Sequence, residues 1–215
     1  MIGAGSEALA RELMEFARSF SFPRTGLSAE GIAAAAAESA WLKSLLRGKA
    51  GAFESFGRWA AAGVPKMAKS CRYVINQEQF DILARRTCME LLRAWRDGPA
   101  EPGRKLSLGS AFCIVDQLFM SINESDPCRS GQVQGFLHAP IAKATLAPLR
   151  ACVDELVDED YSIEIPSSAG TGFIVTEDQY VLVQRAILAL AGEARVAPVT
   201  YAYYCSSPRS ARTSA

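Results

Sequence analysis

The stretch NQEQFDILARRTCMELLRAWR, residues 76–96, decides the fold class of this chain. Apolar side chains, with Thr87 among them, recur in it at intervals of three and four residues: Phe80, Leu83, Thr87, Cys88, Leu91, Leu92 and Trp95. That spacing places them on one side of an α-helix. Asn76 followed by Gln79 is a capping-box arrangement, which satisfies the first backbone amides of a helix. The stretch therefore predicts a long amphipathic helix that begins just after Asn76.

Helical periodicity continues toward the N-terminus. Ser6 and Ser28 are predicted to cap two helices, the second of which runs through an alanine-rich segment to Leu46. A third helix carries Phe53 and is predicted to end before Pro65, because proline lacks the amide hydrogen that a helix interior needs. The N-terminal half is therefore expected to be helical between short breaks.

The same periodicity continues toward the C-terminus. Helices are predicted to end at Ile122, to cover residues 146–156, to begin after the Thr176 cap and to begin again near Pro198. Residues 161–166 alternate in polarity like a short strand, but the sequence offers no partner strand. We therefore expect an all-α, or nearly all-α, multi-helix globular assembly with at most one short extended segment near residues 161–166.

The domain organisation follows from the absence of a linker. No repeat and no long linker divides residues 1–205, which are expected to form a single helical domain. Residues 206–215 contain no large apolar side chain, so ordering them would bury almost nothing to offset the loss of chain entropy. This basic tail is expected to be disordered.

Composition limits the class of protein. Of 215 residues, 49% are hydrophobic and 21% are charged, which is typical of a globular protein and excludes global disorder. Charged residues interrupt residues 1–20, unlike a signal peptide, and the alanine run at 33–37 is too short to span a bilayer. We expect a cytoplasmic protein without a membrane partner.

The cysteines and the single histidine argue against a metal site. The six cysteines form no CxxC pair, and His138 is the only histidine, so neither a metal ion nor a cofactor is expected. Three cysteines fall within helical patterns, where cysteine usually behaves as a small buried hydrophobic residue: Cys88, Cys113 and Cys152. Reduced thiols are the expected state in the cytoplasm.

Charge is segregated along the chain although the net charge is zero. Residues 41–106 hold thirteen basic and six acidic side chains, whereas residues 151–180 hold eight acidic and no basic ones. The candidate binding residues of the basic segment are Lys66, Lys69, Arg72, Arg85, Arg86, Arg93 and Arg96. Three interpretations stay open: ordinary solvated helix surfaces, contact with the acidic segment or with a partner protein, and contact with nucleic acid. Trp41, Trp59 and Tyr73 lie nearby in sequence and could stack on bases.

The segment 123–140 is a second candidate site. It has no helical period, and loops of that length inside a domain are usually functional or mobile. It contains Asp126, Arg129 and His138, which could bind a partner or do acid–base chemistry. The alternatives are a surface loop that only meets water and a histidine that hydrogen-bonds the loop backbone. The sequence shows no nucleophile with a positioned base, so no catalytic residue is assigned.

These observations order the functional hypotheses. The first is a non-enzymatic helical binding module that contacts another macromolecule, which we expect to be a protein or a second copy of the chain. The second is a nucleic-acid-binding component that uses residues 41–106. The third is an enzyme with a site around residues 123–140.

Overall fold

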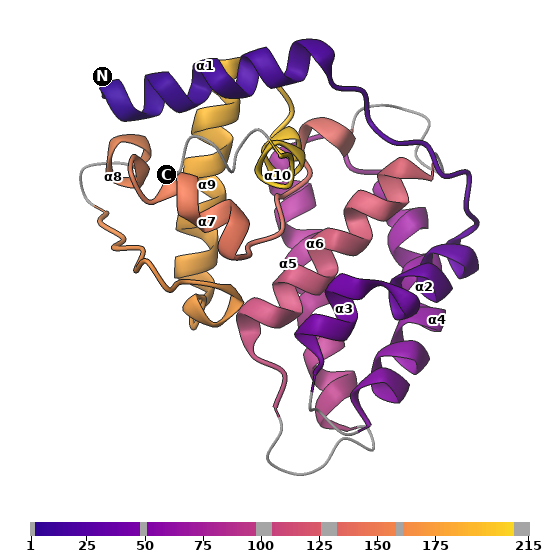
Figure 1. Cartoon of the computed structure of the whole chain (residues 1–215). Helices are drawn as coiled ribbons and strands as arrows, with labels where there is room; N and C mark the ends of the chain where they lie inside the picture. Colours follow the sequence, from indigo (N-terminus) through magenta and orange to yellow (C-terminus); the bar gives the residue numbers. More distant parts are fainter. Residues whose placement is uncertain (1–2, 48–50, 98–104, 126–132, 158–160, 209–215) are drawn as a thin grey trace. The chain divides into compact units, whose positions relative to one another are not determined.

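The chain is helical almost throughout. The computed structural model describes all residues except 1–2, 48–50, 98–104, 126–132, 158–160 and 209–215. The described residues form ten α-helices, two short 3₁₀ helices and no strand (Figure 1). Residues 161–166 are extended and pair with no strand in the described part of the chain. The prediction of an all-α fold is confirmed.

Contacts divide the chain into two compact units. Residues 23–133 form one unit, called here the central unit, and residues 1–22 with 134–215 form the other, the terminal unit. The expectation of one domain over residues 1–205 stays a prediction. So does the disordered tail, because residues 209–215 lie outside the described residues.

The central unit consists of five helices. They are α2 (Ala29–Glu38), α3 (Ala40–Leu45), α4 (Ala52–Cys71), α5 (Gln77–Arg96) and α6 (Leu108–Glu124). α4 packs against α2, α5 and α6, and α6 also packs against α2 and α5. Most of α6 is buried, and the rings of Phe80 on α5 and Phe119 on α6 meet edge to face at 5.1 Å. The sequence of α6 has only two charged residues, Asp116 and Glu124, which fits this central position.

Pro65 does not end α4, contrary to the sequence-based prediction. The helix continues to Cys71 with the proline inside it. Ala61, whose carbonyl loses its helical donor, is exposed, so water can take the place of that bond. Val64, Met67 and Ala68 are buried. Burial of these side chains outweighs the cost of the proline. Because α4 continues past Pro65, Lys66 and Lys69 are helical residues.

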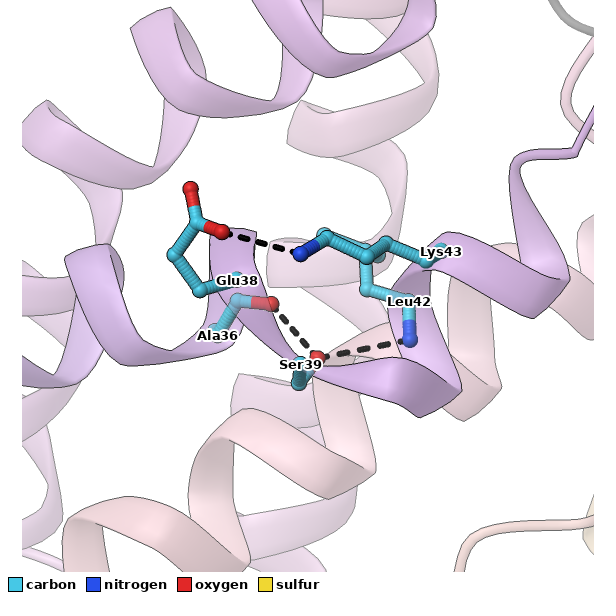
Figure 2. Close-up of polar contacts among 5 residues, drawn as sticks. All are labelled: Ala36, Glu38, Ser39, Leu42 and Lys43. Carbon is cyan, nitrogen blue, oxygen red and sulfur yellow. Dashed lines mark hydrogen bonds and ion pairs between the residues drawn. The ribbon is translucent and has the colours of Figure 1, made fainter.

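Ser39 divides the segment that was predicted as one helix up to Leu46. Its hydroxyl donates to the Ala36 carbonyl at 2.6 Å and accepts from the Leu42 amide at 3.3 Å (Figure 2). The Ser39 side chain thereby ends α2 and caps α3. Serine side chains often compete in this way with the backbone hydrogen bonds of a helix. Lys43 and Glu38 form an ion pair of 2.9 Å across the break (Figure 2).

The terminal unit is built around one long helix. Its helices are α1 (Ala4–Ser19), α7 (Lys143–Leu149), α8 (Val153–Leu156), α9 (Glu177–Ala194) and α10 (Thr200–Cys205), with 3₁₀ helices at Val133–Gly135, which begins in the central unit, and Thr171–Phe173. α1 packs against α8, α9 and α10, and α10 also contacts α7 (Figure 1). The predicted helix over residues 146–156 is therefore two shorter helices.

A glutamate from another helix caps α1. The helix begins at Ala4, so Ser6 lies within it and is not its cap, contrary to prediction. The Glu155 carboxylate of α8 accepts a hydrogen bond of 2.8 Å from the Ser6 amide. A Cβ at Gly3 would lie 2.4 Å from that carboxylate, so a larger residue there would displace the carboxylate from the start of α1. The N-terminus of α1 therefore depends on a contact between residues that are far apart in sequence.

Candidate functional site

The four arginines of α5 lie on its solvent side. Arg85, Arg86, Arg93 and Arg96 are all exposed. The opposite side of the helix is buried, as Phe80, Cys88 and Leu91 show. Eleven residues separate the first arginine from the last, which corresponds to about 16 Å along the helix axis. The structure brings these four predicted residues together.

The three remaining basic candidates lie at the end of α4. Lys66 and Lys69 are exposed on the helix, and Arg72 is exposed directly after it. α4 packs against α5, and only residues 72–76 join the two helices. All seven predicted basic residues therefore lie on two adjacent helices of the central unit.

Apolar side chains are exposed among these charges. Tyr73, Ile75 and Ile82 have exposed fractions of 71%, 67% and 60%. Sequence reasoning named Tyr73 but missed both isoleucines. The signal for Ile82 was present, because it lies opposite the buried stripe of a helix that periodicity had already identified. The seven basic residues together with Tyr73, Ile75 and Ile82 are called here the basic–apolar surface.

Local hydrogen bonds fix the turn that carries Tyr73 and Ile75. The Asn76 side chain accepts from the Gln79 amide at 2.9 Å, which confirms the predicted cap. The Gln79 side chain accepts in turn from the Ile75 amide at 3.1 Å. Val74 is buried between its two exposed neighbours. Tyr73 lies in the turn that ends α4, where its amide donates to the Ser70 carbonyl at 3.0 Å, and both Tyr73 and Ile75 are exposed.

The basic–apolar surface keeps most of its positive charge. Arg86 pairs with Glu90 at 3.2 Å and Arg96 with Asp97 at 3.3 Å. Both pairs are exposed, and exposed ion pairs are weak because water screens them. Between residues 66 and 97, seven basic and four acidic side chains leave a net charge of +3. An anionic partner would therefore be attracted to this surface.

The tryptophans are less available for stacking than the sequence suggested. Trp59 is only 8% exposed and packs against Phe56, with the ring centroids 6.1 Å apart. Trp41 is half-buried. Of the three aromatic residues considered for stacking on bases, Tyr73 is the one that is largely exposed.

The second candidate site is only partly described. Asp126 and Arg129 lie outside the described residues. His138 is buried in the terminal unit, and its Nδ1 lies 2.8 Å from the hydroxyl of Tyr180 on α9. The side chain of Gln184, also on α9, accepts from the Ala139 amide at 3.3 Å and donates to the Ala139 carbonyl at 2.8 Å. This part of the segment is held by α9, and the His138 ring hydrogen-bonds the side chain of Tyr180.

Three described cysteines are poor nucleophiles. Burial raises the pKa of Cys113 to about 12, with a further contribution from Asp116. Burial raises the pKa of Cys152 to about 11, and Glu155 adds to that increase. Burial also raises the pKa of Cys205 to about 12. A thiol attacks as its thiolate, so none of the three is activated at neutral pH.

Neither a metal centre in the described residues nor a similarity to a known protein indicates a function for the chain. Within the described ranges, histidine, cysteine, aspartate and glutamate side chains form no group of three or more that could hold a metal ion. None of the helices that the structure describes has the length and apolar character needed to cross a membrane. Comparison with protein-family models, curated proteins and solved structures finds no match. The physical character of the basic–apolar surface is therefore the basis for proposing a function.

Proposed function

We propose that this chain is a helical binding module that contacts another protein through the basic–apolar surface of its central unit. The observation that carries the proposal is the exposure of Tyr73, Ile75 and Ile82 among exposed arginines and lysines. Apolar side chains gathered on a surface and rimmed by polar groups mark interaction sites. Their burial against a partner would supply about 25 cal/mol for each Å² removed from water.

The composition of the surface favours a protein partner over nucleic acid. Tyrosine and arginine are enriched in the energetically important parts of protein interfaces. Ile75 and Ile82 would find no apolar counterpart along a phosphate backbone. A protein can cover the isoleucines and also present carboxylates to the arginines.

Nucleic acid is the second candidate, and one observation favours it. Tyr73 is exposed beside Arg72 and within one helical turn of Lys69, so an aromatic ring that could stack on a base adjoins two cations. Binding of this kind would weaken steeply as the salt concentration rises, because phosphate contacts release counterions. Binding that depends on the isoleucines would be much less sensitive to salt.

The proposal is tested by affinity capture from a lysate of the native host treated with nuclease. The disruptive variant is Ile75→Ser with Ile82→Gln. The matched control is Val175→Ser with Leu188→Gln, since Val175 also precedes a helix cap and donates its amide to a glutamine, Gln179, at 2.8 Å. Leu188 is likewise an exposed apolar residue within a helix.

We expect the wild-type chain and the control to retain a protein that the disruptive variant loses. Equal capture by both variants would contradict the proposal. Capture that occurs only in a parallel lysate without nuclease treatment would favour the nucleic-acid alternative. We also propose a cytoplasmic location, which is supported by cysteines carried as buried thiols.

A further inference from the structure

A spacing of seven residues relates three apolar side chains that lie before and along α5. Ile75, Ile82 and Met89 are each seven residues apart. Ile82 is exposed and Met89 half-buried, and both lie on the side of α5 away from the core. Two helical turns separate them, about 10.5 Å along the axis. The solvent side of α5 therefore carries an apolar line, called here the α5 seam, made of Ile82 and Met89.

Arginines flank the α5 seam. Arg86 and Arg93 each follow a seam residue by four positions, so they lie next to it on one side. Arg85 follows Ile82 by three positions and lies on the other side. All three are exposed. An apolar line with cations beside it is the pattern that a helix shows where it pairs with another helix.

We propose that the α5 seam binds an amphipathic α-helix of another protein, with acidic side chains on both sides of the apolar stripe of that helix. This inference rests on the proposed function and names its partner. A second helix repeats its own apolar positions every 3.5 residues on average, so it matches a seam whose members are seven residues apart. A strand repeats every two residues and would leave most of its apolar side chains without a counterpart on α5.

Charge decides which helix fits. A helix packed on the α5 seam at the usual 8–10 Å between axes would bring its flanking side chains to Arg86, Arg93 and Arg85. Carboxylates at those positions would be attracted, whereas lysines would be repelled. The Arg86–Glu90 pair leaves the arginine exposed, so it can be shared with an incoming carboxylate.

The test uses a synthetic helix as the probe. The probe is a peptide of three heptads with leucine at positions a and d and glutamate at e and g. Its glutamates repel one another in a homodimer, which keeps the peptide available for a basic partner. One control peptide carries lysine at e and g, and a second has the composition of the acidic peptide in scrambled order. Fluorescence anisotropy with the full-length chain measures binding of all three.

We expect the acidic amphipathic peptide to bind about tenfold or more tightly than either control peptide, which corresponds to about 1.4 kcal/mol. Ile82→Gln with Met89→Gln should remove that preference, because glutamine keeps the helix but cannot pack on leucine. Leu188→Gln, a change of the same kind on α9, should leave it intact. Circular dichroism verifies that each variant is folded.

The outcomes separate this inference from the proposed function. Equal binding of the acidic peptide and its scrambled form, or binding unaffected by the α5 changes, would overturn the helix as partner. If the Ile75→Ser, Ile82→Gln variant still failed to capture the partner protein from the lysate, the proposed function would hold without this inference. Tighter binding of phosphatidylserine vesicles or of a single-stranded oligonucleotide than of the acidic peptide would also overturn this inference.

Discussion

Burial decides what the cysteines of this protein can do. A rise in pKa from 9.0 to about 12 for Cys113 or Cys205 lowers the thiolate fraction about a thousandfold at neutral pH. We predict that a Cys128→Ser variant, which removes the one cysteine outside the described residues, reacts slowly with a disulfide reagent until it is unfolded. Absorbance of the released thiolate measures the rate with and without urea. Prompt labelling of the folded variant would contradict the buried placement of these thiols.

Glu155 gives the terminal unit a dependence on pH. The Ser6 backbone amide, followed by the Ser6 side chain, lowers the pKa of this carboxyl below its ordinary value of 4.5. A carboxyl whose pKa is lower in the folded state stabilises the protein above its unfolded pKa, and this stabilisation is lost as pH falls through the folded value. We predict that Glu155→Gln lowers the free energy of unfolding at pH 7. The difference from wild type should shrink below about pH 4.5.

Urea unfolding at a series of pH values measures that difference. Glu164→Gln is the control, because Glu164 is an exposed glutamate of the same unit. A difference between Glu155→Gln and wild type that stays constant from pH 7 to pH 3 would show that the carboxylate charge is not what holds the start of α1.

Pro65 offers a prediction at the scale of one helix. Its ring removes one backbone hydrogen bond from the interior of α4, at a cost of about 3 kcal/mol. Proline also restricts the unfolded chain, which returns about 0.4–1 kcal/mol of stability. We predict that Pro65→Ala stabilises the protein by about 2 kcal/mol and raises its melting temperature. A lower melting temperature would mean that packing of the ring matters more than the missing bond.

Local signals explain which elements were predictable from the sequence. The caps at Asn76 and Thr176 were predicted because cap and partner lie three residues apart, and both are confirmed. The continuation of α4 past Pro65 was missed because it depends on burial against other helices. The cap of α1 was missed because Glu155 is 149 residues away from Ser6.

In the candidate site, too, the features that depend on local sequence were predictable and those that depend on distant contacts were not. The arginines of α5 could be placed on one side from their spacing alone. Exposure of Ile75 depends on how the turn after α4 is folded, which the sequence does not reveal. His138 was recognised as the lone histidine, but its partner Tyr180 is 42 positions along the chain and comes from another helix.

The placement of the aromatic residues allows a test of the whole molecule. All three tryptophans, Trp41, Trp59 and Trp95, belong to the central unit, so their fluorescence reports on that unit alone. Circular dichroism reports on the helices of both units. If residues 1–205 form a single domain, we predict that the two signals follow one urea transition with the same midpoint.

A difference between the two midpoints would contradict the single domain and would give the stability of each unit. Tyrosine absorbance provides the complementary signal, because Tyr161, Tyr180, Tyr201, Tyr203 and Tyr204 belong to the terminal unit and Tyr73 alone to the central unit.

The terminal unit is assembled from both ends of the chain, and this has a consequence for biosynthesis. α1 is translated well before α9, against which it packs and which begins only at Glu177. At about 5–20 residues per second, the intervening chain takes roughly ten to thirty seconds to translate. During that interval Leu9 and Leu13 have no α9 to cover them, whereas the central unit is one continuous stretch that is complete much earlier. α1 is therefore a segment of this protein that a chaperone would hold until α9 has been translated.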